Sequence, residues 1–473
     1  MTTQRVKLQE WLPDQPSTSG ALLQANNTVP LLDGYGPFPN AVDYSNDAGA
    51  NLSNVYASKF DRVIELFAGS AGALYKYNVG TQNLDDVSKS GGYNGSGRWR
   101  FAQFGQKLLA VDNNDKIQSW TADTSTNFAD VSADAPVAKF ITVVRDFVVV
   151  GDVGGVTNKV AWSDINDETN YTSGSTSQAD YQIIPDGGDI TGLTGGEFGL
   201  VFLERSIVRF SYIGSPLFFQ FDTISRGLGC TVAGSVAQYG TVSYFLSDDG
   251  FYSCDGTSVK GIGAEKIDRY FFSHVDFGTI DSMSAAVDPV KNLIVWNYPK
   301  TSGGRGLIMY NFQNGRWATA DTTSDYISSV TTAGVTLEDL DGFGLLDDLD
   351  TSLDSRLWTG GKLLFAGTDG QKIVTFTGSN STAEFITGDL EFGYNSLVNL
   401  ARPIIENGSS QVALASRKNL DDTITYGSFY SANSDGRIGI RNNGRWHRIK
   451  MRPSGSWLHA MAIDIDVVPR GNR

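Results

Sequence analysis

One local pattern recurs along most of this chain and limits the folds open to it. An apolar run leads into a turn of Gly, Asp or Asn, and a second run follows that ends near an aromatic residue. Each copy is typical of a β-hairpin with a polar turn. Seven copies begin at Val63, Leu108, Val148, Leu200, Ser243, Leu293 and Leu363. Successive starts lie 40–52 residues apart, except for a last interval of 70 residues.

This spacing predicts the fold class. Further strand-like pieces, such as "AGSVAQYG" from Ala233, lie between the hairpins. Two hairpin strands plus one or two more make a four-stranded unit, and such units every 40–50 residues are the signature of β-propeller blades. One small sheet cannot bury both of its faces, whereas radial stacking buries them. We therefore expect an all-β fold, with a β-propeller of about seven blades over residues 51–380. Six or eight blades remain open if one hairpin is misread.

The two flanks differ from the repeat. Residues 1–50 are rich in Pro, Gly, Asn and Asp, which predicts an irregular, extended N-terminal arm. After Phe376 the hairpin pattern ends, and we expect a separate C-terminal β domain over residues 381–473 with a basic tail. Its last 37 residues, from Arg437, carry eight Lys and Arg against two Asp.

The long last interval contains residues 336–358, which hold seven acidic side chains and one Arg. Without them the interval approaches the usual period, so the segment is interpreted as an insertion in the last blade. A solvated acidic loop is one explanation. A Ca²⁺ site is the other, although "DGFGLLDDLD" lacks the ordered spacing of an EF-hand loop.

Composition excludes several classes. The chain has 473 residues and a net charge of −15, which argues against wrapping a nucleic-acid backbone and suits a surface that DNA slides past. Cys230 and Cys254 are the only cysteines, and we expect two buried free thiols rather than a disulfide framework. The N-terminus has no apolar signal-peptide core, and no apolar run approaches the length of a membrane span. Synthesis in a reducing cytoplasm is the expectation.

Signals for enzymatic chemistry are weak. The three histidines form no metal-ligand pair, and no phosphate-binding loop or nucleophile elbow is present. We expect no catalytic, cofactor-binding or metal-binding residues, no cofactor, and no enzyme. A glycosidase needs only two carboxylates and is not excluded. "SDDGFYSCDG" faintly resembles the Asp box of glycosidase propellers, but Asp249 and Asp255 are interpreted as turn residues.

The tripeptide Gly-Arg-Trp occurs three times, ending at Trp99, Trp317 and Trp446. In the first two copies Gly follows a turn, and we expect Trp to anchor the next strand against the neighbouring sheet. We expect the Arg to point towards solvent or a partner.

The third copy lies in the basic segment, where side chains alternate. Arg445, His447, Ile449 and Met451 are expected on one face of a strand, with Trp446, Arg448, Lys450 and Arg452 on the other. An interface is one interpretation, and a solvated edge strand protected by its charges is the other. The candidate residues for docking a partner or another subunit are Arg441, Arg445, Trp446, Arg448, Lys450 and Arg452.

Four segments together resemble the tail hub, or nozzle, proteins of short-tailed bacteriophages, which include the packaged-DNA stabilisation proteins. They are "EWLPDQPSTSG" with "NNTVPLLDGYGPFP", the block "ITGLTGGEFGLVFLERSIVRFSYIGSPLFFQF", "GLIMYNFQNGRW", and "GRWHRIKMRPSGSWLHAMAIDIDVVPRGNR". These segments span nearly the whole chain. Each is structural rather than catalytic, so the resemblance rests on their ordered combination.

The resemblance implies a structural virion protein of the phage tail, made in the host cytoplasm. It implies a subunit of a ring, commonly hexameric, that extends the DNA channel below the portal and its adaptor. Its partners would be other copies of itself, the head-to-tail connector, and tail fibres or spikes. Genomic DNA would pass through without specific binding and be retained until infection.

Two other functions remain open at this point. A carbohydrate-active propeller, such as a virion depolymerase or a sialidase-like glycosidase, has the same repeat, since fold does not fix function. A cellular scaffold propeller that binds peptides is the third, although no WD or kelch signature is present.

Overall fold

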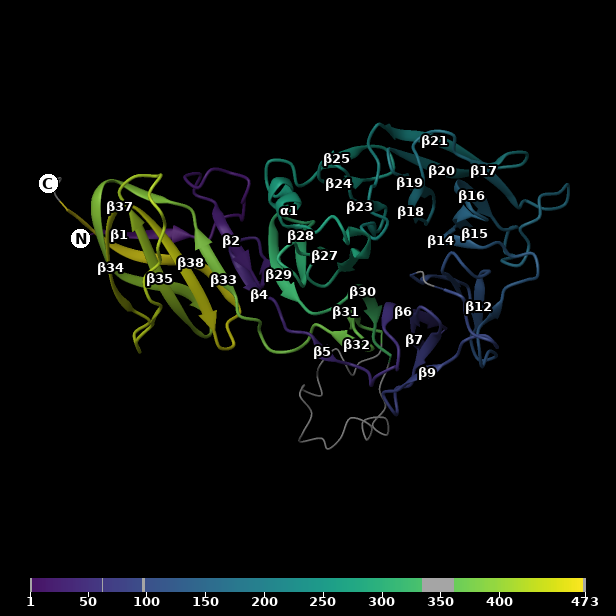
Figure 1. Cartoon of the computed structure of the whole chain (residues 1–473), viewed down its shortest axis with the longest axis horizontal. Coiled ribbons are helices and arrows are strands. Elements are labelled where there is room, and N and C mark those ends of the chain that lie inside the picture. Colours follow the sequence, from purple (N-terminus) through teal and green to yellow (C-terminus); the bar gives the residue numbers. More distant parts are fainter. Residues whose placement is uncertain (1, 62, 96–97, 334–360, 471–473) are drawn as a thin grey trace.

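The seven predicted hairpins form the second and third strands of seven four-stranded units in the computed structural model. The structure describes residues 2–61, 63–95, 98–333 and 361–470. In Figure 1 the units follow one another around a central axis, and the C-terminal β strands lie to one side of them. Six of the units are separate sheets. The remaining unit, over residues 284–322, is part of a larger sheet. The prediction of a β-propeller with a C-terminal β domain is confirmed.

The first three blades follow one another in the sequence. Blade 1 consists of β6 (Leu52–Phe60), β7 (Val63–Ser70), β8 (Leu74–Tyr77) and β9 (Leu84–Asp86). Blade 2 consists of β10 (Arg100–Phe104), β11 (Lys107–Val111), β12 (Gln118–Thr121) and β13 (Ala129–Asp130). Blade 3 consists of β14 (Ala138–Val144), β15 (Phe147–Val153), β16 (Val156–Trp162) and β17 (Asp180–Ile183). All pair as antiparallel meanders.

Blades 4 to 7 continue the meander. Blade 4 consists of β18 (Ile190–Thr194), β19 (Gly199–Leu203), β20 (Ser206–Gly214) and β21 (Phe218–Arg226). Blade 5 consists of β22 (Ala237–Tyr239), β23 (Val242–Leu246), β24 (Phe251–Cys254) and β25 (Val259–Gly261). Helices α1 (Asp268–His274) and η1 (Ile280–Ser282) precede blade 6, which consists of β26 (Ser284–Asp288), β27 (Leu293–Pro299), β28 (Arg305–Asn311) and β29 (Trp317–Thr322). Blade 7 consists of β30 (Tyr326–Thr331), β31 (Leu363–Asp369), β32 (Lys372–Thr375) and the earlier strand β5 (Val42–Asp43).

Blade 3 shows why such segments become hairpins. All seven residues of β15 are buried, and the β-branched run Val148–Val150 favours a strand with both faces covered. The strand ends at Gly154 and Gly155, whose φ angles of 62° and 80° are left-handed. Val153 pairs with Val156, so these glycines form the whole two-residue turn.

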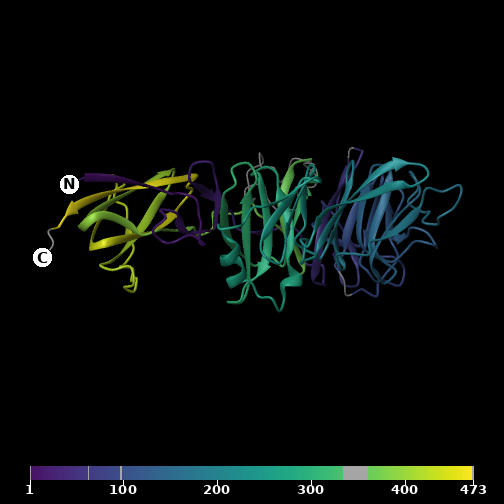
Figure 2. The same cartoon turned by 90° about the horizontal axis from the view of Figure 1, so that it is seen from above.

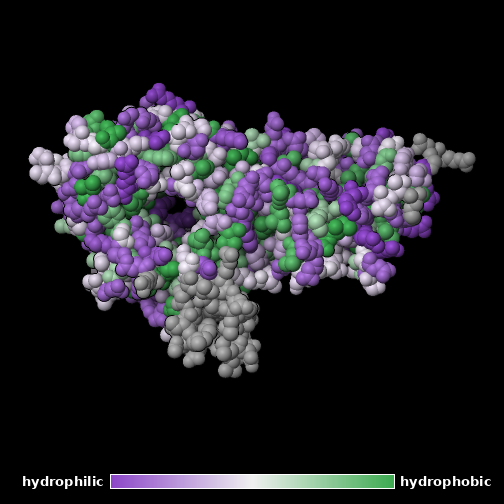
Figure 3. All heavy atoms as spheres, turned by 180° about the vertical axis from the view of Figure 1, so that it is seen from behind, coloured by the Kyte–Doolittle hydropathy of each residue, from purple (hydrophilic) through white to green (hydrophobic). Residues whose placement is uncertain are grey.

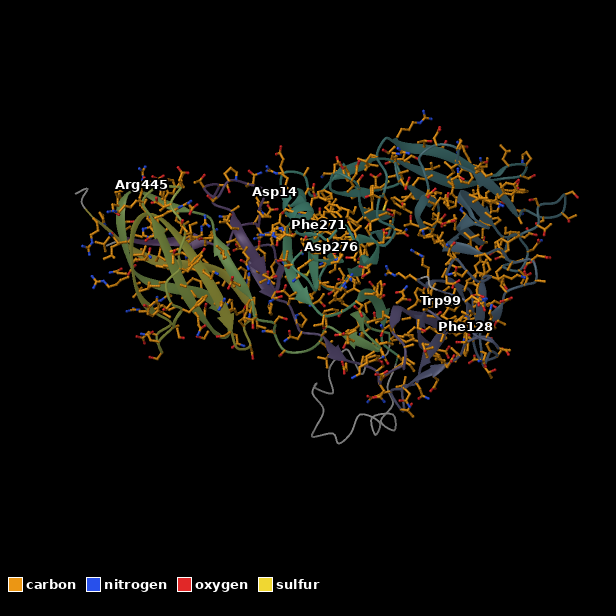
Figure 4. The ribbon with its side chains drawn as sticks, in the orientation of Figure 1. Asp14, Trp99, Phe128, Phe271, Asp276 and Arg445 are labelled. Carbon is orange, nitrogen blue, oxygen red and sulfur yellow. The ribbon has the colours of Figure 1, made fainter. Side chains whose placement is uncertain are left out.

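Neighbouring blades pack through large aromatic side chains. Between blades 1 and 2, Phe67, Trp99 and Phe128 belong to one buried cluster, and Figure 4 labels Trp99 and Phe128 beside each other. The Trp99 indole Nε1 donates a hydrogen bond of 2.8 Å to the carbonyl of Ser70 in blade 1. This arrangement buries the faces that a lone blade would leave exposed.

The ring closes with a strand from the N-terminal region. Strand β5 pairs with β32 and so completes blade 7, with Asp43 opposite Val374. Across the same junction, the Ser328 hydroxyl donates a hydrogen bond of 2.8 Å to Asn54 Oδ1 of blade 1. The strand that precedes blade 1 in the chain is thus paired within blade 7, and a side-chain hydrogen bond joins the two blades.

The first 50 residues are extended, as expected, but more ordered than their composition suggested. They contain β1 (Thr2–Lys7), β2 (Leu22–Asn26), β3 (Thr28–Pro30), β4 (Tyr35–Pro37) and β5. The Pro- and Gly-rich stretches form the turns between these strands. Strands β3 and β4 pair with each other, but β1, β2 and β5 pair with elements hundreds of residues away, such as Thr2 with Val467. Pairing at that distance leaves no local signal in the sequence.

The C-terminal β domain joins the propeller through a continuous sheet. Its strands are β33 (Glu384–Thr387), β34 (Leu390–Glu406), β35 (Ser409–Arg417), β36 (Tyr430–Ser431), β37 (Ile438–Ser454) and β38 (His459–Pro469). Strand β2 links the two parts, since it pairs with β29 of blade 6 and with β33. One hydrophobic cluster runs from Trp296 in blade 6 to Phe385 and Ile463 in the domain. Seen from above in Figure 2, the domain and the propeller form one elongated body.

Candidate functional site

All six candidate docking residues lie on β37, and this strand is not a free tail. It pairs with β35 along one edge and with β33 and β34 along the other. The expectation of a basic tail needs correction here, because Ile438, Ile449 and Met451 are buried and hold the strand inside the sheet. The acidic segment 336–358 lies outside the described residues.

Three of the basic side chains on β37 are already paired with acids. Arg448 contacts Asp389 at 2.8 Å, and Arg452 and Lys450 contact Glu384 at 2.7 and 3.3 Å. Asp389 also receives Arg417 at 2.6 Å. Burial alone would raise the pKa of Asp389, but the hydrogen bonds from Arg448 and Ser17 and the two guanidinium charges hold it below its usual value. Buried Asp389 and partly buried Glu384 therefore supply two negative charges to the four cations that contact them.

The same face is also covered. Lys450 Nζ lies 4.7 Å from the centre of the Tyr426 ring, and the Arg452 guanidinium lies 4.2 Å from the Phe429 ring. Both rings belong to the segment between β35 and β36. Through these cation–π contacts Lys450 and Arg452 interact with side chains of their own domain.

Arg441, Arg445 and Trp446 remain accessible on β37. The Arg441 side chain is exposed and makes no ion pair within the described part of the chain. Arg445 pairs with Glu391 at 2.7 Å but is 57% exposed, and Trp446 beneath it is half-buried. Figure 4 shows Arg445 at the end of the domain that lies far from the propeller. Of the predicted set, these three residues form the surface that a partner can reach.

The alternation predicted for this strand holds in part. His447, Ile449 and Met451 are buried on one face, as expected. Arg445 was expected with them but is exposed. The reason is that the pairing of β34 with β37 shifts register between Glu391 and Ser396, which interrupts the alternation at this point.

The tryptophans of the first two Gly-Arg-Trp copies anchor neighbouring blades, as predicted. Trp99 bonds to blade 1 through Ser70, and Trp317 Nε1 donates a hydrogen bond of 3.3 Å to the carbonyl of Ile262, just after blade 5. Both side chains are fully buried. The prediction for the arginine is wrong for Arg316, which is buried and bonds to the N-terminal arm, whereas Arg98 lines the axial cavity.

Arg316 fastens the N-terminal arm to blade 6. Its Nη1 donates hydrogen bonds to the carbonyls of Leu31 and Leu32, at 2.7 and 3.1 Å. Its Nη2 donates to the carbonyls of Leu8 and Gln9, at 3.3 and 2.9 Å. The guanidinium also lies 4.7 Å from the centre of the Tyr35 ring. One side chain thus satisfies four carbonyls of an otherwise separate segment.

A second contact ties the arm to helix α1. The Asp14 carboxylate accepts hydrogen bonds from the backbone N–H groups of Arg269 and Tyr270, at 2.9 and 2.8 Å. Figure 4 labels Asp14 close to this helix and its buried Phe271. A carboxylate at this end of a helix satisfies free N–H groups and favours the helix dipole.

Helix α1 itself begins with a buried acid. Burial raises the pKa of Asp268 to about 7, and the nearby charges of Asp14 and Asp249 act in the same direction. The backbone N–H of Phe251 donates to its Oδ1 at 3.2 Å. Asp249 and Asp255 lie in turns beside β24, as predicted, and Asp255 accepts hydrogen bonds from the N–H groups of Thr257 and Ser258.

A cavity of about 410 Å³ runs along the propeller axis. The first strand of every blade contributes to its wall, namely β6, β10, β14, β18, β22, β26 and β30. Figure 3 shows a hollow in the propeller half of one face. Arg98 and Arg100 are the two charged side chains on its wall, and no acid lines it within the described part of the chain.

Arg98 reaches across this channel. Its Nη1 donates a hydrogen bond of 3.0 Å to the carbonyl of Met283, which precedes blade 6, and its guanidinium lies 4.7 Å from the Tyr326 ring of blade 7. Arg100 contacts the neighbouring blade 3, where it lies over the Phe140 ring at 4.3 Å and donates to the carbonyl of Lys139 at 3.1 Å. Burial lowers the pKa of Arg98 to about 10 and that of Arg100 to about 9.

Sequence reasoning missed the channel as a site. The signal was present, because "RWR" at residues 98–100 places two cations around the start of an innermost blade strand. Alternation along such a strand directs residues i and i+2 to the same side.

Among the described residues, no group of three His, Cys, Asp or Glu side chains is arranged to hold a metal ion. None of the helices in the described ranges is long and apolar enough to cross a membrane. Cys230 and Cys254 are buried free thiols, as predicted, and burial raises the pKa of both.

Comparisons with known proteins find similarity at the level of structure. No protein-family model matches the sequence. No curated protein matches it either. The WD40 domain of Neurospora crassa Pan2 is similar with a TM-score of 0.39 and 9% identity, covering 72% of this chain and 95% of that one. The N-terminal domain of Nup159 is similar with a TM-score of 0.37 and 11% identity, covering 74% and 98%.

Proposed function

We propose that this chain is a structural subunit of the tail hub, or nozzle, of a short-tailed bacteriophage. In this role it would form a ring below the portal adaptor, retain the packaged DNA, and carry fibres or spikes in the virion tail. The proposal starts from the resemblance of four ordered sequence segments that span nearly the whole chain.

The observation that carries the proposal is the way the N-terminal arm binds both parts of the molecule together. The arm pairs with β38 and β33 in the C-terminal domain, and its Leu8, Gln9, Leu31 and Leu32 carbonyls are held by Arg316 of blade 6. It also completes blade 7. A subunit under mechanical load from confined DNA needs its parts fixed relative to one another, and this arm supplies that fixation.

Charge supports the same role. The chain carries a net charge of −15, so its surface repels the DNA backbone in general. The accessible surface formed by Arg441, Arg445 and Trp446 lies at the distal end of the C-terminal domain. In a ring, a basic patch with an aromatic residue suits contact with an acidic face of the next subunit, which would be a heterologous, closed interface.

The experiment is imaging of the purified full-length protein by negative stain, with its mass measured by light scattering over a range of concentrations. We expect closed rings with a central channel. The variant Arg441→Glu/Arg445→Glu should remain monomeric under conditions where the wild type forms rings, because reversed charges repel an acidic neighbour.

The matched control is Arg145→Glu. Arg145 is also a partly exposed arginine in an ion pair, with Glu197 at 3.4 Å, but it lies on the propeller. Rings formed by the control and not by the double variant would support the proposal. A wild type that stays monomeric at all concentrations would count against a ring-forming hub. Rings formed by the double variant would show that this surface of β37 is not part of the ring interface.

A further inference from the structure

The axial cavity of the propeller contains two cations without a counterion. Arg98 and Arg100 make no ion pair with any described residue, although the chain holds 52 acidic side chains against 37 basic ones. The acid whose charge acts on Arg100 is Asp152, and that carboxylate pairs with Lys139 at 3.9 Å. In an acidic protein, leaving two enclosed guanidinium groups unpaired is costly unless something else balances them.

The hydrogen bonds within the protein use only part of each guanidinium group. Arg98 donates through Nη1 to Met283, and Arg100 donates through Nη1 to Lys139 and, at 3.4 Å, to the carbonyl of Arg98. A guanidinium carries five N–H donors. The remaining guanidinium nitrogens make no hydrogen bond to another residue within the described part of the chain, and both side chains line the cavity.

The wall of the cavity fixes these groups in place. The Tyr326 and Phe140 rings lie 4.7 and 4.3 Å from the two guanidinium groups. Asn54, on the same wall, is held by Trp99 and Ser328. Guanidinium donors held on the wall of a cavity of about 410 Å³ suit a small anionic group. The side-chain types that bind carboxylate and phosphate best in proteins are arginines with free, forked donors.

We propose that the propeller channel binds a small oxyanion, the carboxylate or phosphate group of a small molecule, through Arg98 and Arg100. The ligand enters along the axis and accepts hydrogen bonds from the guanidinium nitrogens that face the cavity. The enclosed position strengthens the attraction relative to bulk water. This inference does not depend on the proposed function, because it requires only the closed propeller.

Two probes distinguish the source of the oxyanion. Inorganic phosphate represents a phosphate group, and D-glucuronate represents a carboxylated sugar. Binding of each to the full-length protein is measured by isothermal titration calorimetry, and the shift in Tm is followed in parallel at constant ionic strength set with sodium chloride. We expect one probe or both to bind and to raise Tm beyond the chloride reference.

The decisive variant is Arg100→Gln. Its affinity for the bound probe should fall about tenfold or more, which is the loss of one charge-assisted interaction. Arg100→Lys should retain part of the affinity, because it keeps the charge but not the fork. The matched control is Arg209→Gln. Arg209 also lies over a ring, that of Phe198 at 4.2 Å, and donates to a carbonyl, but outside the cavity.

Stability without ligand separates a binding role from a purely structural one. If Arg100 serves the ligand, Arg100→Gln in the chloride reference buffer should unfold at nearly the wild-type temperature and should lose the rise in Tm on adding the probe. A variant that is destabilised equally with and without probe would overturn the proposal. So would equal affinities of Arg100→Gln and the wild type, or failure of both probes to bind the wild type.

Discussion

Arginines in the propeller channel and in the C-terminal β domain differ in what balances their charge. In the domain, Arg417 and Arg448 share the buried carboxylate of Asp389. In the channel, Arg98 and Arg100 have backbone carbonyls and aromatic rings as partners. The sequence suggests the opposite, since the domain contains the basic segment and the propeller belongs to the acidic remainder.

This difference shows that a run of basic residues is a poor measure of available positive charge. Strand β37 places its cations beside Glu384 and Asp389, which come 59 to 68 residues earlier in the chain. Pairing across strands removes charge that a count along the sequence would assign to the surface. Arg98 and Arg100, at the start of an innermost strand, have no acidic partner within the described part of the chain.

The strongest test of this comparison is Asp389→Asn. The side chain of Asp389 is 1% exposed, and those of Arg417 and Arg448 are 9% and 15% exposed. Removing the carboxylate charge leaves two largely buried cations unpaired, so we expect a loss of about 3 kcal/mol in the free energy of unfolding. Equilibrium urea unfolding measures it. The control Glu391→Gln removes the partner of exposed Arg445 and should cost less than about 1 kcal/mol. Equal losses in both variants would contradict the comparison.

A smaller effect is expected from Arg316→Ala, which tests a cation balanced only by carbonyls. The substitution leaves the carbonyls of Leu8, Gln9, Leu31 and Leu32 without their donor, and we expect a loss of about 2 kcal/mol. The arm should also be cut faster by protease, because its attachment to blade 6 is weakened. Limited proteolysis followed by mass spectrometry locates the cuts. Unchanged cleavage within residues 1–40, with Arg209→Ala as the control, would argue that β-sheet pairing alone holds the arm.

The third prediction concerns a buried charge of the other sign, Asp268. Its pKa of about 7 in the folded protein lies above the ordinary value of 3.8. The unfolded chain therefore releases this proton at lower pH, and stability falls as the pH rises from about 4 to 7. Above that window the loss is constant. Asp268→Asn retains an acceptor for the Phe251 N–H and should remove this loss, giving a gain of roughly 1–2 kcal/mol at pH 8 and none at pH 4.

Urea unfolding at a series of pH values between 4 and 8 tests this sign. The wild-type and variant curves should meet at low pH and separate above it. Parallel curves would show that Asp268 titrates alike in the folded and unfolded states, and a variant that is less stable at pH 8 would reverse the assignment.

Local features of the fold could be predicted from the sequence, and nonlocal ones could not. All seven hairpins were found because strand, turn and strand are adjacent, as in β15 and β16 around Gly154. The strands of the arm were not, since their partners lie far along the chain, as Asn26 and Glu384 do. The features of the candidate site divide in the same way into local and nonlocal ones. The burial of Trp99 and Trp317 was expected, whereas the directions of Arg98 and Arg316 depend on segments that are distant in sequence.

Completion of blade 7 by β5 has a consequence for how the chain reaches its folded state. Strand β5 is synthesised first in this blade, and its Val42 pairs with Thr375, which is synthesised much later. The separation is larger still for β1, which pairs with β38. During synthesis the leading segment thus emerges long before the elements that receive it, and the ring stays open until the last blade is made. Contacts between such distant positions slow folding and make it cooperative across the whole molecule. A chain interrupted before blade 7 is complete can build several blades, yet it lacks both the closed ring and the anchored arm. Only chains that extend through β38 then have the closed ring and the anchored arm. Interrupted chains would therefore be excluded from any larger assembly that needs both.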